Sequence, residues 1–108
     1  MFFAELIQRL GIDDAVNVKA TVIASGLTAE LAARGTVELA VQQVSELLLV
    51  PGIDVVGPLP SGADSVTMFS AGVLAMSVQA EAALELIGYL RSSSAAQALC
   101  AAGLQPAA

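Results

Sequence analysis

The apolar residues of this chain follow two patterns, a spacing typical of helices and continuous runs typical of buried strands. Near the N-terminus they recur at the spacing of one helical face, at Phe3, Leu6, Ile7 and Leu10. Gly11 follows directly, at the position where a glycine commonly ends a helix. Residues 80–90 repeat the same spacing and give the clearest helix prediction in the chain.

Two further helices are predicted from their boundary residues. One begins with Thr28 as its N-cap and ends at Arg34 and Gly35, a cation followed by a glycine. The other is capped by one of the serines at 92–94 and ends at Gly103. These boundary signals are local, so they predict helix ends without any knowledge of the packing.

The remaining apolar runs favour strands. Residues 18–24, 37–41 and 53–56 are rich in β-branched side chains. A short helix over 46–50 between the last two runs would complete a strand, helix and strand unit, and residues 66–77 read as a long extended segment. The sequence therefore predicts an α/β fold.

The junction before this short helix is the candidate binding site, formed by Gln42, Gln43, Val44 and Ser45. A strand would deliver amide side chains and free backbone N–H groups to a helix start, where a carboxylate or oxyanion can bind. The alternative is structural, with Ser45 as an N-cap and both glutamines satisfying buried backbone groups. The anion site is favoured in a two-lobed protein, and the structural alternative in an isolated lobe.

Composition bounds the class of protein. The 108 residues suffice for one domain, and 56% are hydrophobic, with a mean hydropathy of +0.80. Such an excess must lie in the core or face another lobe or another copy of the chain. The net charge of −6 disfavours nucleic acid. No membrane span is predicted, because the apolar stretch 65–80 is interrupted by polar residues and is shorter than the roughly 20 residues needed.

Catalytic chemistry has little support in the sequence. Histidine is absent, which excludes histidine-based triads and leaves only carboxylates for a metal. Asp13 and Asp14 form the only acidic pair, and Cys100 is expected to be a buried, inert thiol. No catalytic residue, metal ligand or cofactor is predicted, and the chain is expected not to be an enzyme.

Three segments together resemble a known family: RGTVELAVQQVSELLLVPGIDVVGPLP, TMFSAGVLA and the terminal AAGLQP. Their order is similar to the C-terminal portion of molybdate-type periplasmic solute-binding proteins of bacterial ABC transporters. The resemblance implies a partial type II periplasmic-binding-protein-like fold that lacks the N-terminal lobe. It implies one domain over 1–108, with the second lobe at about 1–65 and a crossing segment with return helices at about 66–108.

The resemblance also implies which residues meet a ligand. The family's strand-to-helix contact maps to Gln42 and Gln43, where molybdate binders have Val-Tyr. The family's ligand tyrosine maps to Phe69, which lacks the hydroxyl, and Ser70 beside it joins the candidate site. Both departures weaken the case for molybdate itself. For Phe69 a place in the core is the competing interpretation.

The function implied by this resemblance is the solute-binding component of an ABC transporter, in truncated form, for molybdate, another oxyanion or a small solute. Its partners would be that solute, an ABC permease and a second copy of the chain, in a dimer formed by exchange of the crossing segment or the C-terminal helices. The alternative is a stand-alone, self-associating lobe with a regulatory or structural role. The resemblance favours the periplasm, whereas residues 1–10 do not read as a signal peptide, which leaves the cytoplasm open.

Overall fold

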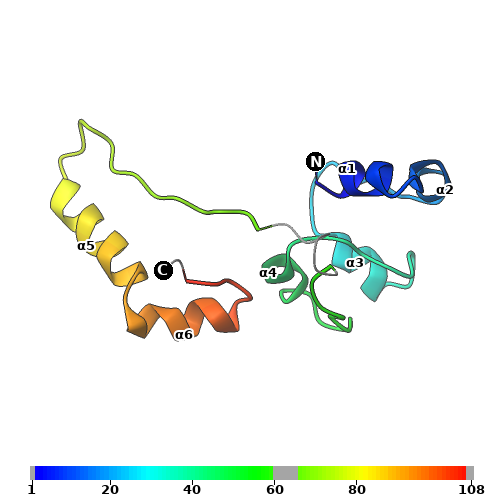
Figure 1. The fold of residues 1–108 in the computed structure, drawn as a ribbon. Coiled ribbons are helices and arrows are strands. Elements are labelled where there is room, and N and C mark those ends of the chain that lie inside the picture. The colour runs from blue at the N-terminus through cyan, green and yellow to red at the C-terminus, as the bar shows by residue number, and fades with distance from the viewer. Residues whose placement is uncertain (1, 60–65, 107–108) are drawn as a thin grey trace. The chain divides into compact units, whose positions relative to one another are not determined.

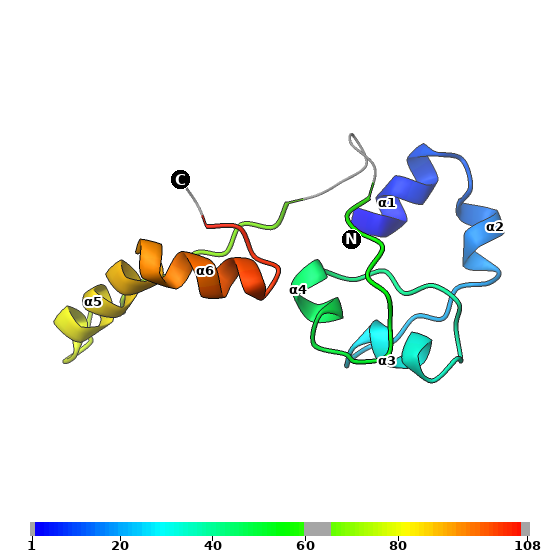
Figure 2. The same cartoon turned by 90° about the horizontal axis from the view of Figure 1, so that it is seen from below.

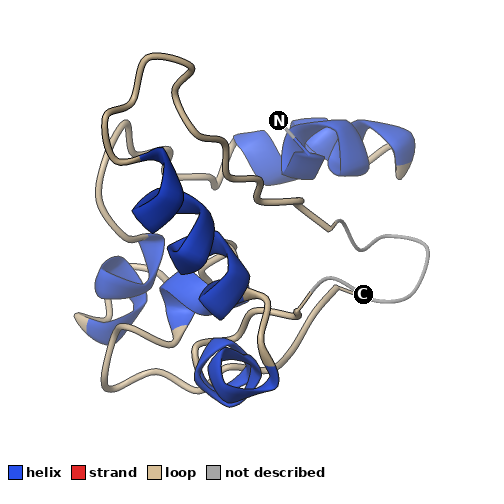
Figure 3. Ribbon diagram, turned by 90° about the vertical axis from the view of Figure 1, so that its left-hand side faces the viewer, coloured by secondary structure: helices blue, strands red, loops and turns tan. Residues whose placement is uncertain are grey.

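The computed structural model describes residues 2–59 and 66–106, and these residues form six helices and no strand (Figures 1 and 3). In chain order the helices are α1 (Phe2–Arg9), α2 (Asp13–Asn17), α3 (Thr28–Ala33), α4 (Val44–Leu47), α5 (Ala80–Leu90) and α6 (Ser93–Ala101). The chain divides into two compact units, Met1–Val66 with α1 to α4 and Thr67–Ala108 with α5 and α6. The predicted lobe boundary near residue 65 lies outside the described residues, and the single-domain organisation stays a prediction.

Helix α1 confirms the prediction from its apolar spacing. Leu6 and Ile7 are each only 4% exposed, and α1 contacts α2 (Figure 2). Leu10, predicted on the same face, lies beyond the end of the helix and is 58% exposed. The buried stripe of α1 is therefore one turn shorter than the sequence pattern indicates.

Three helices end in the same way, at the glycines that the sequence singled out. After α1 the N–H of Ile12 donates to the carbonyl of Ile7 at 3.0 Å, and the N–H of Gly11 donates to the carbonyl of Gln8 at 2.9 Å. Gly11 has φ +67°, so this pair of bonds is a Schellman motif. Gly35 and Gly103 close α3 and α6 with the same two bonds and with φ of +74° and +79°.

The segments predicted as strands form neither a helix nor a strand in the structure. Residues 20–23, 37–43 and 53–57 make no backbone hydrogen bond to one another among the described residues. A strand is stabilised by its ladder to a neighbour, so an apolar run alone does not produce one. Helix α4 between them begins at Val44 and has a single turn, two residues earlier than predicted. The α/β class stays a prediction.

The second unit consists of α5, α6 and the preceding segment 67–79. Helix α5 has the predicted bounds, and it contacts α6. Ser92 is the residue that caps α6, since its hydroxyl accepts from the N–H of Ala95 at 3.3 Å. Ala95 is the one buried apolar residue among the described part of this unit. The second unit thus has helices but almost no core of its own.

Across both described ranges, no helix combines the length and the apolar character that crossing a bilayer requires.

Candidate functional site

The first residue of α3 and the junction before α4 are joined by a side-chain clamp. The backbone N–H of Thr28 donates to Oε1 of Gln42 at 2.8 Å, and the Thr28 hydroxyl donates to the same oxygen at 2.9 Å. The hydroxyl also lies 3.5 Å from the carbonyl of Val41, at the limit of hydrogen bonding. One amide oxygen therefore satisfies the backbone N–H at the start of a helix from 14 residues away.

This clamp corrects one prediction and confirms another. Thr28 is not the N-cap of α3, because Leu27 takes that position without a side-chain hydrogen bond. The alternative that the glutamines satisfy backbone groups is observed at Gln42. Sequence reasoning missed the pairing, because no local pattern relates residues 28 and 42, which meet only when α3 and α4 pack together.

Helix α4 starts at the candidate junction but offers little helix dipole. Its first internal bonds run from the N–H groups of Glu46 and Leu47 to the carbonyl of Gln43, each at 3.0 Å. The N–H groups of Val44 and Ser45 precede these bonds and are available to a ligand. With four residues, however, α4 sums few peptide dipoles, so any anion here depends on individual donors.

Two side chains of the junction differ from expectation. Ser45 lies inside α4, and the N-cap position belongs to Gln43, whose side chain makes no capping bond. The interpretation of Ser45 as an N-cap is therefore wrong. Gln43 is exposed, and Gln42 and Ser45 are half-buried. The side chains of residues 42–45 thus include two amides and one hydroxyl that are at least partly accessible to a ligand.

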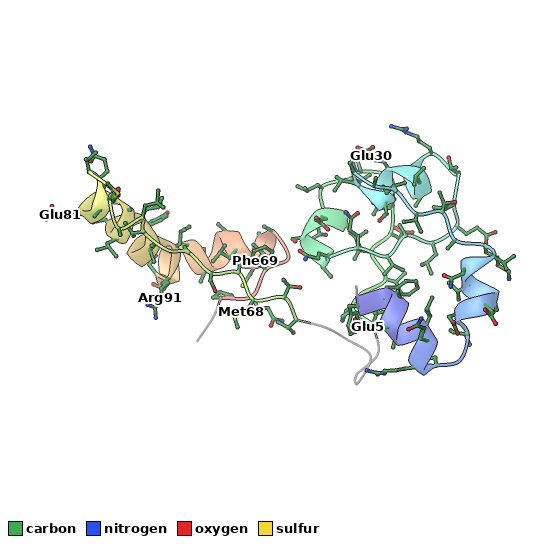
Figure 4. The ribbon with its side chains drawn as sticks, turned by 90° about the horizontal axis from the view of Figure 1, so that it is seen from above. Glu5, Glu30, Met68, Phe69, Glu81 and Arg91 are labelled. Carbon is green, nitrogen blue, oxygen red and sulfur yellow. The ribbon has the colours of Figure 1, made fainter. Side chains whose placement is uncertain are left out.

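Phe69 and Ser70 belong to the second unit, whereas the four junction residues belong to the first. Phe69 is 69% exposed and projects from the segment before α5, as does its neighbour Met68 (Figure 4). The competing interpretation of Phe69 as a core residue is wrong for the described chain. Its ring is free to cover a solute or a protein surface.

Two hollows in the surface lie outside the predicted site. One, of about 290 Å³, is in the first unit and is lined by Leu27, Glu30, Ala33, Arg34, Leu49, Val50 and Pro51. Arg34 and Glu30 approach to 3.7 Å there, with side chains 73% and 51% exposed, so this ion pair contributes little. The other hollow follows the bend at residues 74–78 in the second unit. Neither contains a predicted ligand residue.

Further chemistry is sparse in the described residues. No group of three histidine, cysteine or carboxylate residues lies close enough together to hold a metal ion within 2–59 and 66–106. Cys100 is exposed, which corrects the expectation of a buried thiol.

Comparison with known proteins decides the family. A family description, bacterial extracellular solute-binding protein, matches residues 2–105. The chain belongs to this family. This match to the bacterial extracellular solute-binding proteins confirms the prediction of a solute-binding protein. The family description does not specify molybdate.

An individual relative adds a chemical name. This solute-binding chain is 40% identical over 101 residues to the aconitate isomerase of a Pseudomonas species. The aligned residues make up 94% of the chain and 38% of the relative. The chain thus spans about two fifths of that protein. The relative's name weighs against the prediction that the chain is not an enzyme. No solved structure matches the chain.

Proposed function

We propose that this chain is the part of an extracellular solute-binding protein that receives a small carboxylate anion. The observation that carries the proposal is the 40% identity to an aconitate isomerase across almost the whole chain, within a solute-binding family. Aconitate carries three carboxylates and is the first solute to test. Molybdate is less well supported, since Gln42, Gln43 and Phe69 depart from the residues of molybdate binders.

The proposed site is the junction before α4, in the first unit. In the first unit the donors are the amides of Gln42 and Gln43, the N–H groups of Val44 and Ser45, and the Ser45 hydroxyl. Each can bond a carboxylate oxygen, and bonds to a charged acceptor are about twice as strong as neutral ones. Ser70 and Phe69, in the second unit, are candidate ligand residues through the family resemblance alone.

The chain's charge makes these short-range donors necessary. With a net charge of −6, the field of this chain repels an anion. Screening at physiological salt limits that repulsion to about 8 Å, whereas hydrogen bonds act on contact. Affinity for a carboxylate then depends on amides and N–H groups in place of lysine or arginine.

Calorimetry on the complete protein that contains this chain tests the proposal. We expect trans- or cis-aconitate to bind at least tenfold more tightly than molybdate or sulfate. Tighter binding of molybdate, or no heat from any carboxylate, would show that the proposal is wrong.

The name of the relative also favours a second candidate, isomerisation of aconitate by the complete protein. An isomerisation leaves the composition unchanged, so a route in which a base removes a proton from carbon also returns a proton to the carbon skeleton. Glu46 is the acidic residue of α4 and is half-buried beside the junction, so it is the candidate base. Proton NMR of a mixture of aconitate and protein would follow the conversion. Loss of conversion on Glu46→Gln, with binding retained, is expected; conversion at the wild-type rate would exclude that role.

The proposal extends to location and partners. An extracellular solute-binding family fits the periplasm, and an ABC permease would receive the bound solute there. Cell fractionation and uptake of labelled aconitate in a strain lacking the gene test both points. The alternative, a self-associating lobe with a regulatory role, is favoured if the protein stays in the cytoplasm and binds no solute.

A further inference from the structure

The orientation of the Gln42 amide is fixed by chemistry. Two groups of Thr28 point at the same atom of this side chain, at 2.8 and 2.9 Å. A backbone N–H can only donate, so the atom facing it must be the amide oxygen and not the nitrogen. The NH₂ group of Gln42 therefore lies on the side of the amide away from Thr28.

We infer that Thr28 is a positioning residue that holds Gln42 as a hydrogen-bond donor to a carboxylate of the solute. This inference rests on the proposed function and deepens it. With its oxygen occupied by two donors, the Gln42 side chain has only N–H groups left to offer. An amide that turned freely would present oxygen or nitrogen with similar ease, and it would accept from a solute as readily as it donates.

The consequence is selectivity by charge sign. A site whose amide can only donate bonds an ionised carboxylate and leaves a protonated amine without a partner, which costs affinity. Fixing the amide in advance also lowers the conformational entropy lost when the solute binds. The clamp therefore directs the junction to carboxylate anions, although the chain carries a net negative charge.

Three variants of the complete protein separate donation from folding. Gln42→Glu keeps an acceptor for both Thr28 groups and replaces the donating NH₂ with an oxygen. Thr28→Val removes the hydroxyl and keeps the backbone N–H, and Thr28→Ser restores the hydroxyl. Gln8→Glu is the matched control, since it introduces the same charge at an exposed position on α1.

Calorimetry with aconitate, together with thermal melting, gives the readout. Gln42→Glu should weaken binding by at least about tenfold, because a charge-assisted bond is lost and a repulsive oxygen takes its place. Thr28→Val should weaken binding severalfold without a matching loss of melting temperature, Thr28→Ser should recover it, and Gln8→Glu should bind as the wild type does.

The NMR signals of the Gln42 side-chain NH₂ supply a signature that a merely structural role would not give. They should shift on titration with aconitate in the wild type and shift less in Thr28→Val. Wild-type affinity in Gln42→Glu, with binding by the wild type established, would overturn this inference alone. Failure of the wild-type protein to bind any carboxylate would overturn the proposed function together with it.

Discussion

At the scale of single residues, local rules predict helix ends well and side-chain partners poorly. Gly11 follows an apolar repeat, whereas Gly35 and Gly103 end helices that are predicted from their boundary residues, and each of the three adopts a positive φ in a Schellman motif. The bond between Thr28 and Gln42 follows no such rule, because it depends on how α3 and α4 pack. The candidate residues at 42–45 could be named from the sequence, but the orientation of their groups could not.

Gly35→Ala tests the residue-scale account of helix ends. Gly35 has φ +74° and nothing within 4 Å of an added Cβ, so the cost is backbone strain alone. We expect the substitution to lower the free energy of unfolding by about 1–2 kcal/mol. Gly88→Ala is the control, since Gly88 lies inside α5 without positive φ and should gain about 0.5–1 kcal/mol in the helix. Equal effects of the two changes in chemical denaturation would contradict this account.

At the scale of elements, helices could be predicted and strands stay untested. The period of α5 predicts its bounds because a helix satisfies its own backbone hydrogen bonds. Residues 37–41 and 53–56 have the composition of strands, but their backbone groups need neighbours that the described residues do not supply. Sequence therefore predicts local elements, whereas a sheet depends on which other segments are present.

The start of α6 provides an element-scale prediction. Sequence alone left the cap open among the serines at 92–94, and the structure selects Ser92 by its bond to the N–H of Ala95. Ser92→Ala should destabilise α6 by about 1 kcal/mol, because one backbone N–H loses its acceptor. Ser94→Ala, inside the same helix, should change stability little. Circular dichroism during urea unfolding would measure both, and an equal loss in the two variants would exclude the assigned cap.

At the scale of the whole molecule, the second unit exposes apolar side chains that its own small core does not bury. Among the described residues of the second unit only Ala95 is buried, and its other apolar side chains are exposed or half-buried. Residues 66–80 carry no charged side chain, and Met76 and Val78 are 95% and 94% exposed. An apolar surface of this kind is typical of an interface with another protein chain.

The whole-molecule prediction is that the isolated chain self-associates. A second copy can cover this surface by exchanging the segment 66–78 or the helices α5 and α6, and an uncharged segment avoids repulsion between two chains of charge −6. Light scattering after gel filtration should give at least twice the 10.9 kDa of the chain.

Charge introduced on the exposed surface should oppose this association. Met76→Lys and Val78→Lys should lower the measured mass, because burying an unpaired ammonium is costly. Gln8→Lys is the control, since it adds the same charge at an exposed polar position of α1, outside the segments that a second copy would exchange. A well-folded monomer at high concentration would contradict the prediction.

The exposed thiol of Cys100 has a practical consequence for measuring solute binding. Because it is the chain's only cysteine, a maleimide fluorophore attached there marks α6 alone. Binding of the proposed solute to the complete protein would then be followed through the emission of this dye.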